Sequence, residues 1–407
     1  MENRRAGDCL ASTARLLWLP LKITLATAFP ADPERPRGGV EAVSVILADA
    51  LARQPSIEIH VVTVDEACTA AHVSQWNRVT VHRLPWRARR MLTGAVGAAG
   101  AAVRGYVQHL GADVVHAHDT YGLMLSDLDG PRVLTIHGFI HADTAVSGEP
   151  LAAVRSRLWR RAEHRAWSRF PHIISISPYV RERLTGVATG AIHDIDNPTA
   201  LPFFDVVRRD AGNRIFCAAS ITPRKNIAGL VEAFAILRQR FPAAHLRIAG
   251  PAPAPGYAAQ VRERIRVLGL DESVTLLPSL ATSDVCAELS AASVAALVSL
   301  EENAPLTVQE AMAAAVPVVT SNRCGMPYQV QDGENGFLVD PLDPAAVADR
   351  LAWLLENPAA RLQMGRSGRA VADARFHADA VATRTRRVYE LAAGRPFSPL
   401  SAASQSV

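Results

Sequence analysis

The chain has 407 residues, of which 49% are hydrophobic and 20% charged, and this composition excludes disordered and collagen-like proteins. Its formal net charge is +4, from 43 basic and 39 acidic residues, which is too small to indicate nucleic acid as a partner, and we expect none. At about 150 residues per domain, the length predicts two or three domains, each large enough to bury a core.

Cysteine usage and hydropathy indicate a cytoplasmic protein. The five cysteines are odd in number, far apart and without a Cys-x-x-Cys spacing, which is typical of reduced thiols. No run reaches the roughly 18 apolar residues of a membrane span. Near the start, Arg4 and Arg5 precede an apolar run from Leu16 that Lys22 interrupts, so we interpret residues 1–20 as an N-terminal extension rather than a signal peptide.

Short β-branched runs alternate along the chain with Ala-, Leu- and Arg-rich stretches of helical period, and this pattern predicts parallel β-α-β units. In the first half the predicted strands are 22–27, 57–64, 114–118, 133–137, 173–177 and 191–196. In the second half they are 215–219, 246–249, 274–277, 294–299, 318–320 and 337–339. The main predicted helices are 40–53, 155–169, 227–240, 257–268, 305–315 and 344–356.

A proline-bearing stretch separates the two halves. Residues 197–205 contain two prolines and precede a polar Arg-Arg-Asp-Ala-Gly-Asn run, which predicts a connection with a domain boundary at about residue 205. We expect an α/β fold of two doubly wound domains that face a central cleft, where ligands meet the carboxyl ends of the strands. The expected parts are an extension 1–20, a first domain 21–204, a second domain 205–375, a last helix at about 376–393 that returns to the first domain, and a flexible tail 394–407.

Residues 299–310, Ser-Leu-Glu-Glu-Asn-Ala-Pro-Leu-Thr-Val-Gln-Glu, carry the strongest functional pattern. A predicted strand ends at Ser299 and a helix begins near Pro305, with Asn303 expected as its N-cap. Glu302 then lies in the loop at the sheet edge, whereas Glu310 lies on the helix. Two glutamates at this spacing are by themselves usually surface residues, but the strand–loop–helix context favours a binding site.

The loop at residues 303–306 could hold a phosphate. The backbone amides of Asn303, Ala304 and Leu306 lie at the start of the helix, where amides and the helix dipole attract anions, while Pro305 has no amide. One carboxylate beside sugar hydroxyls and another beside ribose hydroxyls would suit a nucleotide sugar.

A second strand–loop–helix pattern ends in Pro-Arg-Lys-Asn at residues 223–226. The forked guanidinium of Arg224 and the compact ammonium charge of Lys225 could together hold a pyrophosphate at the edge where the strands of the sheet end. Lys225 is one of only two lysines in the chain, although an Arg-Lys pair alone is more often a solvated loop.

Two glycines follow the first strand, Gly38 and Gly39, and they would allow a ligand to approach the backbone at a helix start. The pattern Gly-Gly-Val-Glu is not Gly-x-Gly-x-x-Gly, so it does not predict a dinucleotide site. A plain surface turn is the alternative.

Histidines end two strands of the first half. His116, His118 and Asp119 end one strand, and His137 ends the next. Histidines two apart on a strand face the same side, so a metal site is an alternative, but no fourth ligand is indicated. We predict hydrogen-bonding roles in a sugar site and no metal.

Together the two glutamates, the Pro-Arg-Lys-Asn and Gly-Gly-Val-Glu loops, and Asp-Gly-Glu-Asn-Gly at 332–336 resemble the family 4 retaining glycosyltransferases, also called glycosyl transferases group 1. The resemblance covers about residues 21–393 and implies the GT-B fold, two Rossmann-like domains around a cleft. The chain departs from the family pattern at Ala218-Ala219-Ser220, where Gly-Arg is usual, and at Tyr328, where glutamate is usual.

The resemblance also implies site roles. It implies catalytic roles for Glu302, His137 and Lys225. It implies donor binding by Arg224, Lys225, Asn303, Ala304, Pro305, Leu306, Glu310 and Gly39, with Glu310 on the ribose. We place Gly38, His116 and His118 on the acceptor side.

The predicted function is a retaining glycosyltransferase without cofactor or metal. It would move a sugar from a UDP- or GDP-sugar to a hydroxyl of a sugar, glycan or lipid-linked acceptor, in glycan, polysaccharide or glycolipid biosynthesis. The alternatives are a non-catalytic GT-B protein that binds a nucleotide or glycan, and a GT-B epimerase. A pyridoxal-type phosphorylase would need a Schiff-base lysine, for which Lys225 in a cation pair is a poor candidate.

Two basic, aromatic stretches fall in the first half, at residues 83–90 and 159–167. They could contact anionic lipid at the inner face of the membrane, around a lipid-linked acceptor. The alternative is a pair of solvated helix faces whose arginine stems cover the core.

Overall fold

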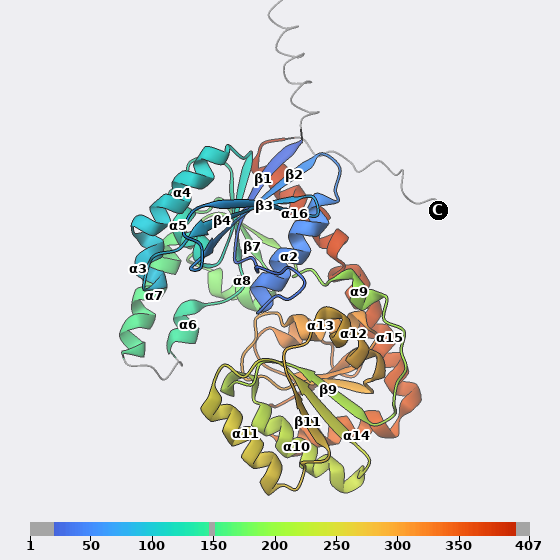
Figure 1. Ribbon diagram of the computed structural model, residues 1–407. Coiled ribbons are helices and arrows are strands. Elements are labelled where there is room, and N and C mark those ends of the chain that lie inside the picture. The colour runs from blue at the N-terminus through green and yellow to red at the C-terminus, as the bar shows by residue number, and fades with distance from the viewer. Residues whose placement is uncertain (1–19, 146–150, 396–407) are drawn as a thin grey trace, which may run out of the picture.

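The computed structural model describes residues 20–145 and 151–395 and has two α/β lobes, one above the other in Figure 1. The predicted extension 1–20 and tail 394–407 lie almost entirely outside the described residues. Each lobe is built on one sheet with helices on both faces, so the predicted fold class is confirmed.

The first sheet has eight strands in the order β3-β4-β2-β1-β5-β6-β7-β8. Their bounds are β1 Leu21–Ala26, β2 Ile57–Asp65, β3 His72–Trp76, β4 Val79–Pro85, β5 Val114–His118, β6 Arg132–Ile136, β7 His172–Ser175 and β8 Ala191–Asp194. All neighbours pair in parallel except β3 and β4, an antiparallel pair at one edge. That pair was not predicted.

The second sheet has six parallel strands in the order β11-β10-β9-β12-β13-β14. Their bounds are β9 Arg214–Ala218, β10 His245–Ala249, β11 Val274–Leu277, β12 Val294–Leu297, β13 Val318–Ser321 and β14 Gly336–Val339. Because β9 and β12 are adjacent although they are far apart in sequence, the order of the strands reverses there, and the loops after β9 and β12 meet at a switch point that favours ligand binding.

Helices cover both faces of each sheet (Figure 1). In the first half they are α2 Gly39–Ala52, α3 Met91–Val96, α4 Ala98–Leu110, α5 Thr120–Leu125, α6 Ile140–Ala145, α7 Ala152–Trp167 and α8 Pro178–Leu184. In the rest of the chain they are α9 Leu201–Phe204, η1 Pro223–Lys225, α10 Ile227–Arg240, α11 Pro255–Val267, α12 Thr282–Ala291, α13 Leu306–Ala313, η2 Met326–Tyr328, α14 Pro344–Glu356, α15 Pro358–Arg375 and α16 Ala378–Ala392.

The predicted connection at 197–205 is not wholly irregular, because it contains the short helix α9. Its Phe203 and Phe204 are buried in the core of the second half, which fixes this turn of helix. Farther along, α15 follows the second lobe and α16 crosses back to pack on α2 of the first (Figure 1). Tyr389 of α16 is fully buried there, in the apolar layer that α2 and α16 form with the sheet.

Candidate active site

A cavity of about 330 Å³ lies where the two lobes meet. The first half contributes the start of α2 and the loop that follows β6, and the second half contributes the loops after β9 and β12. Among the predicted site residues, the cavity is lined by Gly39, His137, Arg224, Lys225, Glu302, Asn303, Ala304, Pro305 and Leu306. The fold therefore gathers these residues, which lie as much as 267 positions apart, in one place.

Glu302 forms the centre of the charged groups in this cavity. It lies in the loop after β12 and is only 8% exposed. Its Oε1 atom pairs with Lys225 Nζ and lies 3.2 Å from Arg224 Nη1, and Arg224 Nη1 also donates to the carbonyl oxygen of Glu301 at 2.7 Å. One carboxylate thus holds both cations at the edge of the second sheet.

The two cations owe their position to local backbone structure. Pro223 opens the single turn η1, and Asn226 ends it in the left-handed region at φ 51°, where asparagine is tolerated. The side chain of Asn226 donates to the carbonyl oxygen of Pro341 at 2.6 Å. The turn is therefore fixed on both sides, and it presents Arg224 and Lys225 together.

Helix α13 begins at Leu306, two residues later than an N-cap at Asn303 would place its first residue. Pro305 occupies the N-cap position, and the expected capping by Asn303 is wrong, because the Asn303 side chain donates instead to the carbonyl oxygen of His137 at 2.7 Å. The backbone amides of Asn303, Ala304 and Leu306 donate no hydrogen bond within the described part of the chain. Since these residues line the cavity, their amides are available to an anion.

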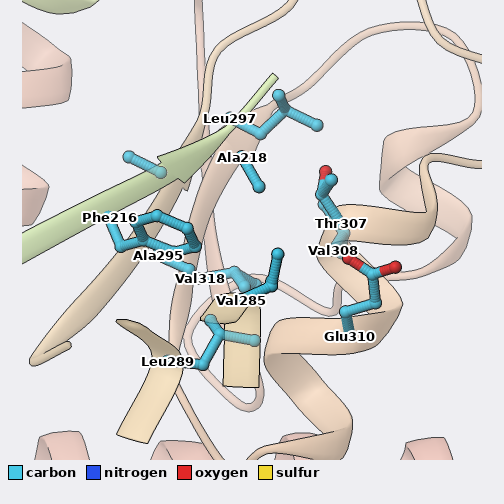
Figure 2. A pocket seen from close by; sticks show the side chains of 11 residues that line it. Phe216, Ala218, Val285, Leu289, Ala295, Leu297, Thr307, Val308, Glu310 and Val318 are labelled. Carbon is cyan, nitrogen blue, oxygen red and sulfur yellow. The ribbon is translucent and has the colours of Figure 1, made fainter. Parts of the chain in front are cut away.

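Glu310 lies in a separate small pocket of about 10 Å³ next to this cavity, shown in Figure 2. Its lining is mostly apolar: Phe216, Ala218, Val285, Leu289, Ala295, Ala296, Leu297, Thr307, Val308 and Val318. Burial in this pocket raises the pKa of Glu310 to about 7. Ala218 and Thr307 line both hollows, so the Glu310 carboxylate adjoins the cavity of Glu302.

Asp119 fixes the loop that follows β6 and begins with His137. Its carboxylate accepts hydrogen bonds from the amides of His137 at 2.7 Å and Gly138 at 3.4 Å. The His137 Nε2 atom lies 3.1 Å from Nδ1 of His118. Burial lowers the pKa of His137 and of His118, so both rings are neutral at physiological pH.

The expected acceptor-side positions of His116 and His118 are wrong. His116 is fully buried, with Nε2 at 2.7 Å from Thr135 Oγ1 and Nδ1 at 2.7 Å from the hydroxyl of Tyr389. His118 is also buried and reaches the cavity only through His137. Both belong to the support behind His137, because α16 covers this part of the sheet. Gly38 precedes α2 as its N-cap and does not line the cavity, whereas Gly39 does.

The cavity also contains residues that the sequence patterns did not single out. Asp143 on α6 and Asn197 lie on its first-half side, and Ser220 and Thr307 on its second-half side. The Thr307 hydroxyl is buried and has no hydrogen-bond partner in the described part of the chain. The sequence could have indicated Thr307 as a site residue, because it lies in the first turn of α13, three residues before Glu310 and on the same face of the helix.

Two family models match the chain. Glycosyl transferases group 1 matches residues 203–371, and Glycosyltransferase Family 4 matches residues 37–199. A D-inositol 3-phosphate glycosyltransferase of Corynebacterium efficiens is 35% identical over 173 residues, 42% of this chain, and the match spans only 40% of that relative's length. A phosphatidyl-myo-inositol mannosyltransferase of Mycobacterium tuberculosis H37Rv is 28% identical over 312 residues, 72% of this chain and 77% of the relative.

Solved structures share the fold. Sucrose-phosphate synthase of Thermosynechococcus elongatus superposes with a TM-score of 0.77 at 22% identity, over 91% of this chain and 98% of that one. HepE of Anabaena in complex with UDP-glucose gives a TM-score of 0.69 at 18% identity, over 92% and 99%. With the two parallel-sheet lobes and the residues gathered between them, the matches to both halves establish that the chain belongs to the group 1, family 4 glycosyltransferases and has their GT-B fold.

Proposed function

We propose that the protein is a retaining glycosyltransferase that uses a nucleoside diphosphate sugar. The observation that carries this proposal is the grouping of Lys225, Arg224 and unbonded backbone amides around Glu302, beside the Glu310 pocket. The diphosphate would bind the two cations and the amides of 303–306. The ribose would bind Glu310, and the sugar would contact Glu302 and His137.

This arrangement suits a reaction in which negative charge develops on the leaving diphosphate. Fixed cations and amides aimed at that charge stabilise it without rearrangement at the moment of reaction. Lys225 and Arg224 would exchange their contacts with Glu302 for the diphosphate, and the freed carboxylate would accept hydrogen bonds from sugar hydroxyls. His137, neutral and held by Asp119, would orient the sugar from the first half.

The donor is a UDP- or GDP-sugar. HepE, which shares the fold, was solved with UDP-glucose, and this favours a uracil base as the first to test.

For the acceptor we propose a hydroxyl of a polyol, which a lipid could carry. No helix in the described part of the chain is long and apolar enough to cross a membrane. Arg89 and Arg90 are exposed at a groove of about 790 Å³ whose lining includes Leu84, Val103 and Tyr106. This groove favours an anionic amphiphile at residues 83–90.

The stretch 159–167 contributes less to such a contact, because Trp159 and Trp167 are buried in the core of the first half. Their burial supports the alternative in which arginine stems cover the core. Sedimentation with anionic and neutral vesicles at low and high salt tests the contact, and equal partitioning to both kinds would exclude it.

Release of a nucleoside diphosphate tests the proposed activity. The full chain is incubated with UDP-glucose and with GDP-mannose, each with a polyol acceptor, and the nucleotide and the glycoside are followed by NMR. A new glycosidic bond with the donor's anomeric configuration is expected. Binding of UDP without any turnover would support the non-catalytic alternative, and a changed sugar still attached to its nucleotide would support an epimerase.

A further inference from the structure

An acidic side chain of the first half faces the cations of the second half. Asp143 lies on α6 and lines the central cavity together with Arg224 and Glu302. Partial burial raises the pKa of Asp143. The Arg224 charge lowers this pKa and the Glu302 charge raises it, so both charged groups interact electrostatically with Asp143. In the described part of the chain, its carboxylate makes no hydrogen bond or ion pair.

The backbone that carries Asp143, a residue exposed at the cavity wall, is anchored at its start by a buried carboxylate. Glu163 on α7 is 2% exposed and accepts hydrogen bonds from the amides of Ile140 at 2.9 Å and His141 at 3.1 Å. It also accepts one from His141 Nδ1 at 2.7 Å. These bonds fix the first turn of α6, which places Asp143 at the cavity wall before any ligand binds.

Asp119 anchors the same segment one step earlier in the chain, through the amides of His137 and Gly138. The carboxylates of Asp119 and Glu163 therefore hold residues 137–141 from behind. Asp143 follows this fixed segment, and its exposed carboxylate has no partner among the described residues, so it is available as a hydrogen-bond acceptor at the cavity wall.

The charges around the cavity decide what Asp143 can accept. Among the described residues that line it, Arg224 and Lys225 are the only arginine or lysine side chains, and both already face Glu302. With the proposed donor bound, its diphosphate occupies them. Glu302 then contacts the donor sugar, and Asp143 and Glu301 remain as the two carboxylates beside the space left for the acceptor. Such a space favours hydroxyl groups, which can donate, and disfavours phosphate groups.

We infer that Asp143 is a specificity-determining residue that accepts a hydrogen bond from a hydroxyl of an uncharged polyol acceptor and discriminates against acceptors phosphorylated on the reacting ring. This inference rests on the proposed function and narrows its acceptor class.

The experiment compares paired acceptors, myo-inositol with D-inositol 3-phosphate and glucose with glucose 6-phosphate, using whichever donor the full chain turns over. The variants are Asp143→Asn and Asp143→Ala, and the matched control is Asp129→Asn, an exposed aspartate of the same half outside the cavity. The readouts are kcat and KM for each acceptor, and the Kd for UDP as a check that the donor site is intact.

The wild-type chain is expected to prefer the uncharged member of each pair. Asp143→Asn should raise the KM for the uncharged polyol about tenfold and shift the kcat/KM ratio about tenfold or more toward the phosphorylated member, since a like charge is removed. The Kd for UDP should change less than twofold, and Asp129→Asn should behave as wild type.

Three results would overturn the inference while leaving the proposed function intact: a wild-type preference for the phosphorylated acceptors, an equal loss on both members of each pair, or unchanged ratios in both Asp143 variants. Failure of the wild-type chain to release nucleoside diphosphate from any donor would instead remove the proposed function, and the inference with it.

Discussion

The side-chain amide of Asn303 donates a hydrogen bond to the carbonyl oxygen of His137, with 2.7 Å between nitrogen and oxygen, across the junction of the two lobes. Asn303 follows Glu302 of the second half, and His137 lies in the loop that Asp119 fixes in the first half. This one bond therefore couples the loop after β12 to the loop after β6. It sets their spacing at the cavity, where a donor and an acceptor would have to be aligned.

Asn303→Ala should lower kcat/KM for sugar transfer about three- to tenfold, the effect of about 0.5–1.5 kcal/mol expected for one neutral hydrogen bond. The loss should fall mainly on kcat, because both loops remain present but are less well aligned. Steady-state kinetics measure it, with Gln108→Ala on the exposed side of α4 as the control. An Asn303→Ala enzyme with the kinetics of the control would show that the bond does not matter for alignment.

The two lysines of the chain provide a matched pair for the diphosphate site. Lys225→Met should reduce turnover about 10²- to 10³-fold and weaken UDP binding, because it removes the charge nearest the proposed leaving group. Glu302→Ala should reduce turnover by a similar factor, because it removes the proposed contact to the donor sugar.

Lys22→Met is the control for this pair. Lys22 is on β1, and its Nζ atom donates to the carbonyl oxygen of Leu110 at 2.7 Å, away from the cavity. The Lys22→Met substitution should leave the affinity for UDP unchanged. If calorimetry found the same UDP affinity for Lys225→Met and Lys22→Met, the diphosphate would have to bind elsewhere.

Most strands could be predicted because β-branched runs in parallel sheets are short, buried and bounded by polar loops. The β3–β4 pair could not be recognised in this way, because it is an antiparallel edge ribbon with a mostly exposed outer strand. Its signals were the alternation in Val-Thr-Val-His-Arg-Leu from Val79 and the turn at Asn77, which has φ 50°.

The site was predictable where the loops of one parallel sheet carry it and not where distant elements meet. Arg224 and Lys225 lie in the loop after β9, Glu302 lies in the loop after β12, and loops after parallel strands lie at the same edge of the sheet. The burial of His116 depends on Tyr389, which α16 brings back from 273 residues away. Asn303 has the sequence position of an N-cap, and only its tertiary contact with His137 explains why it does not cap α13.

A chelator should leave the transfer rate unchanged, because the proposed charge stabilisation uses Lys225, Arg224 and backbone amides. Among the described residues, no three His, Cys, Asp or Glu side chains are grouped as metal ligands. Transfer is measured with and without EDTA after removal of free divalent ions. Full loss with EDTA and recovery with Mg²⁺ or Mn²⁺ would contradict the assignment of the diphosphate to these cations.

Glu310 should make both stability and nucleotide binding depend on pH. Burial raises its pKa from 4.5 to about 7, so between these values the folded chain keeps a proton that the unfolded chain has released. The free energy of unfolding should therefore fall as the pH rises from about 4.5 to about 7, and Glu310→Gln, which cannot ionise, should escape this fall. At pH 8 relative to pH 5, the variant should gain about 1–2 kcal/mol over the wild type in denaturant unfolding.

Binding should change in the opposite sense, because the ionised carboxylate is the better acceptor for two ribose hydroxyls. The advantage of wild type over Glu310→Gln in UDP affinity should therefore grow from pH 6 to pH 8. The phosphates of UDP and the buried Glu163, whose pKa is also raised to about 7, titrate in both proteins, so their contributions cancel in this comparison. An affinity ratio that stays constant over this range, together with equal unfolding curves at pH 5 and pH 8, would mean that Glu310 is ionised throughout and that the apolar pocket of Figure 2 does not govern its charge.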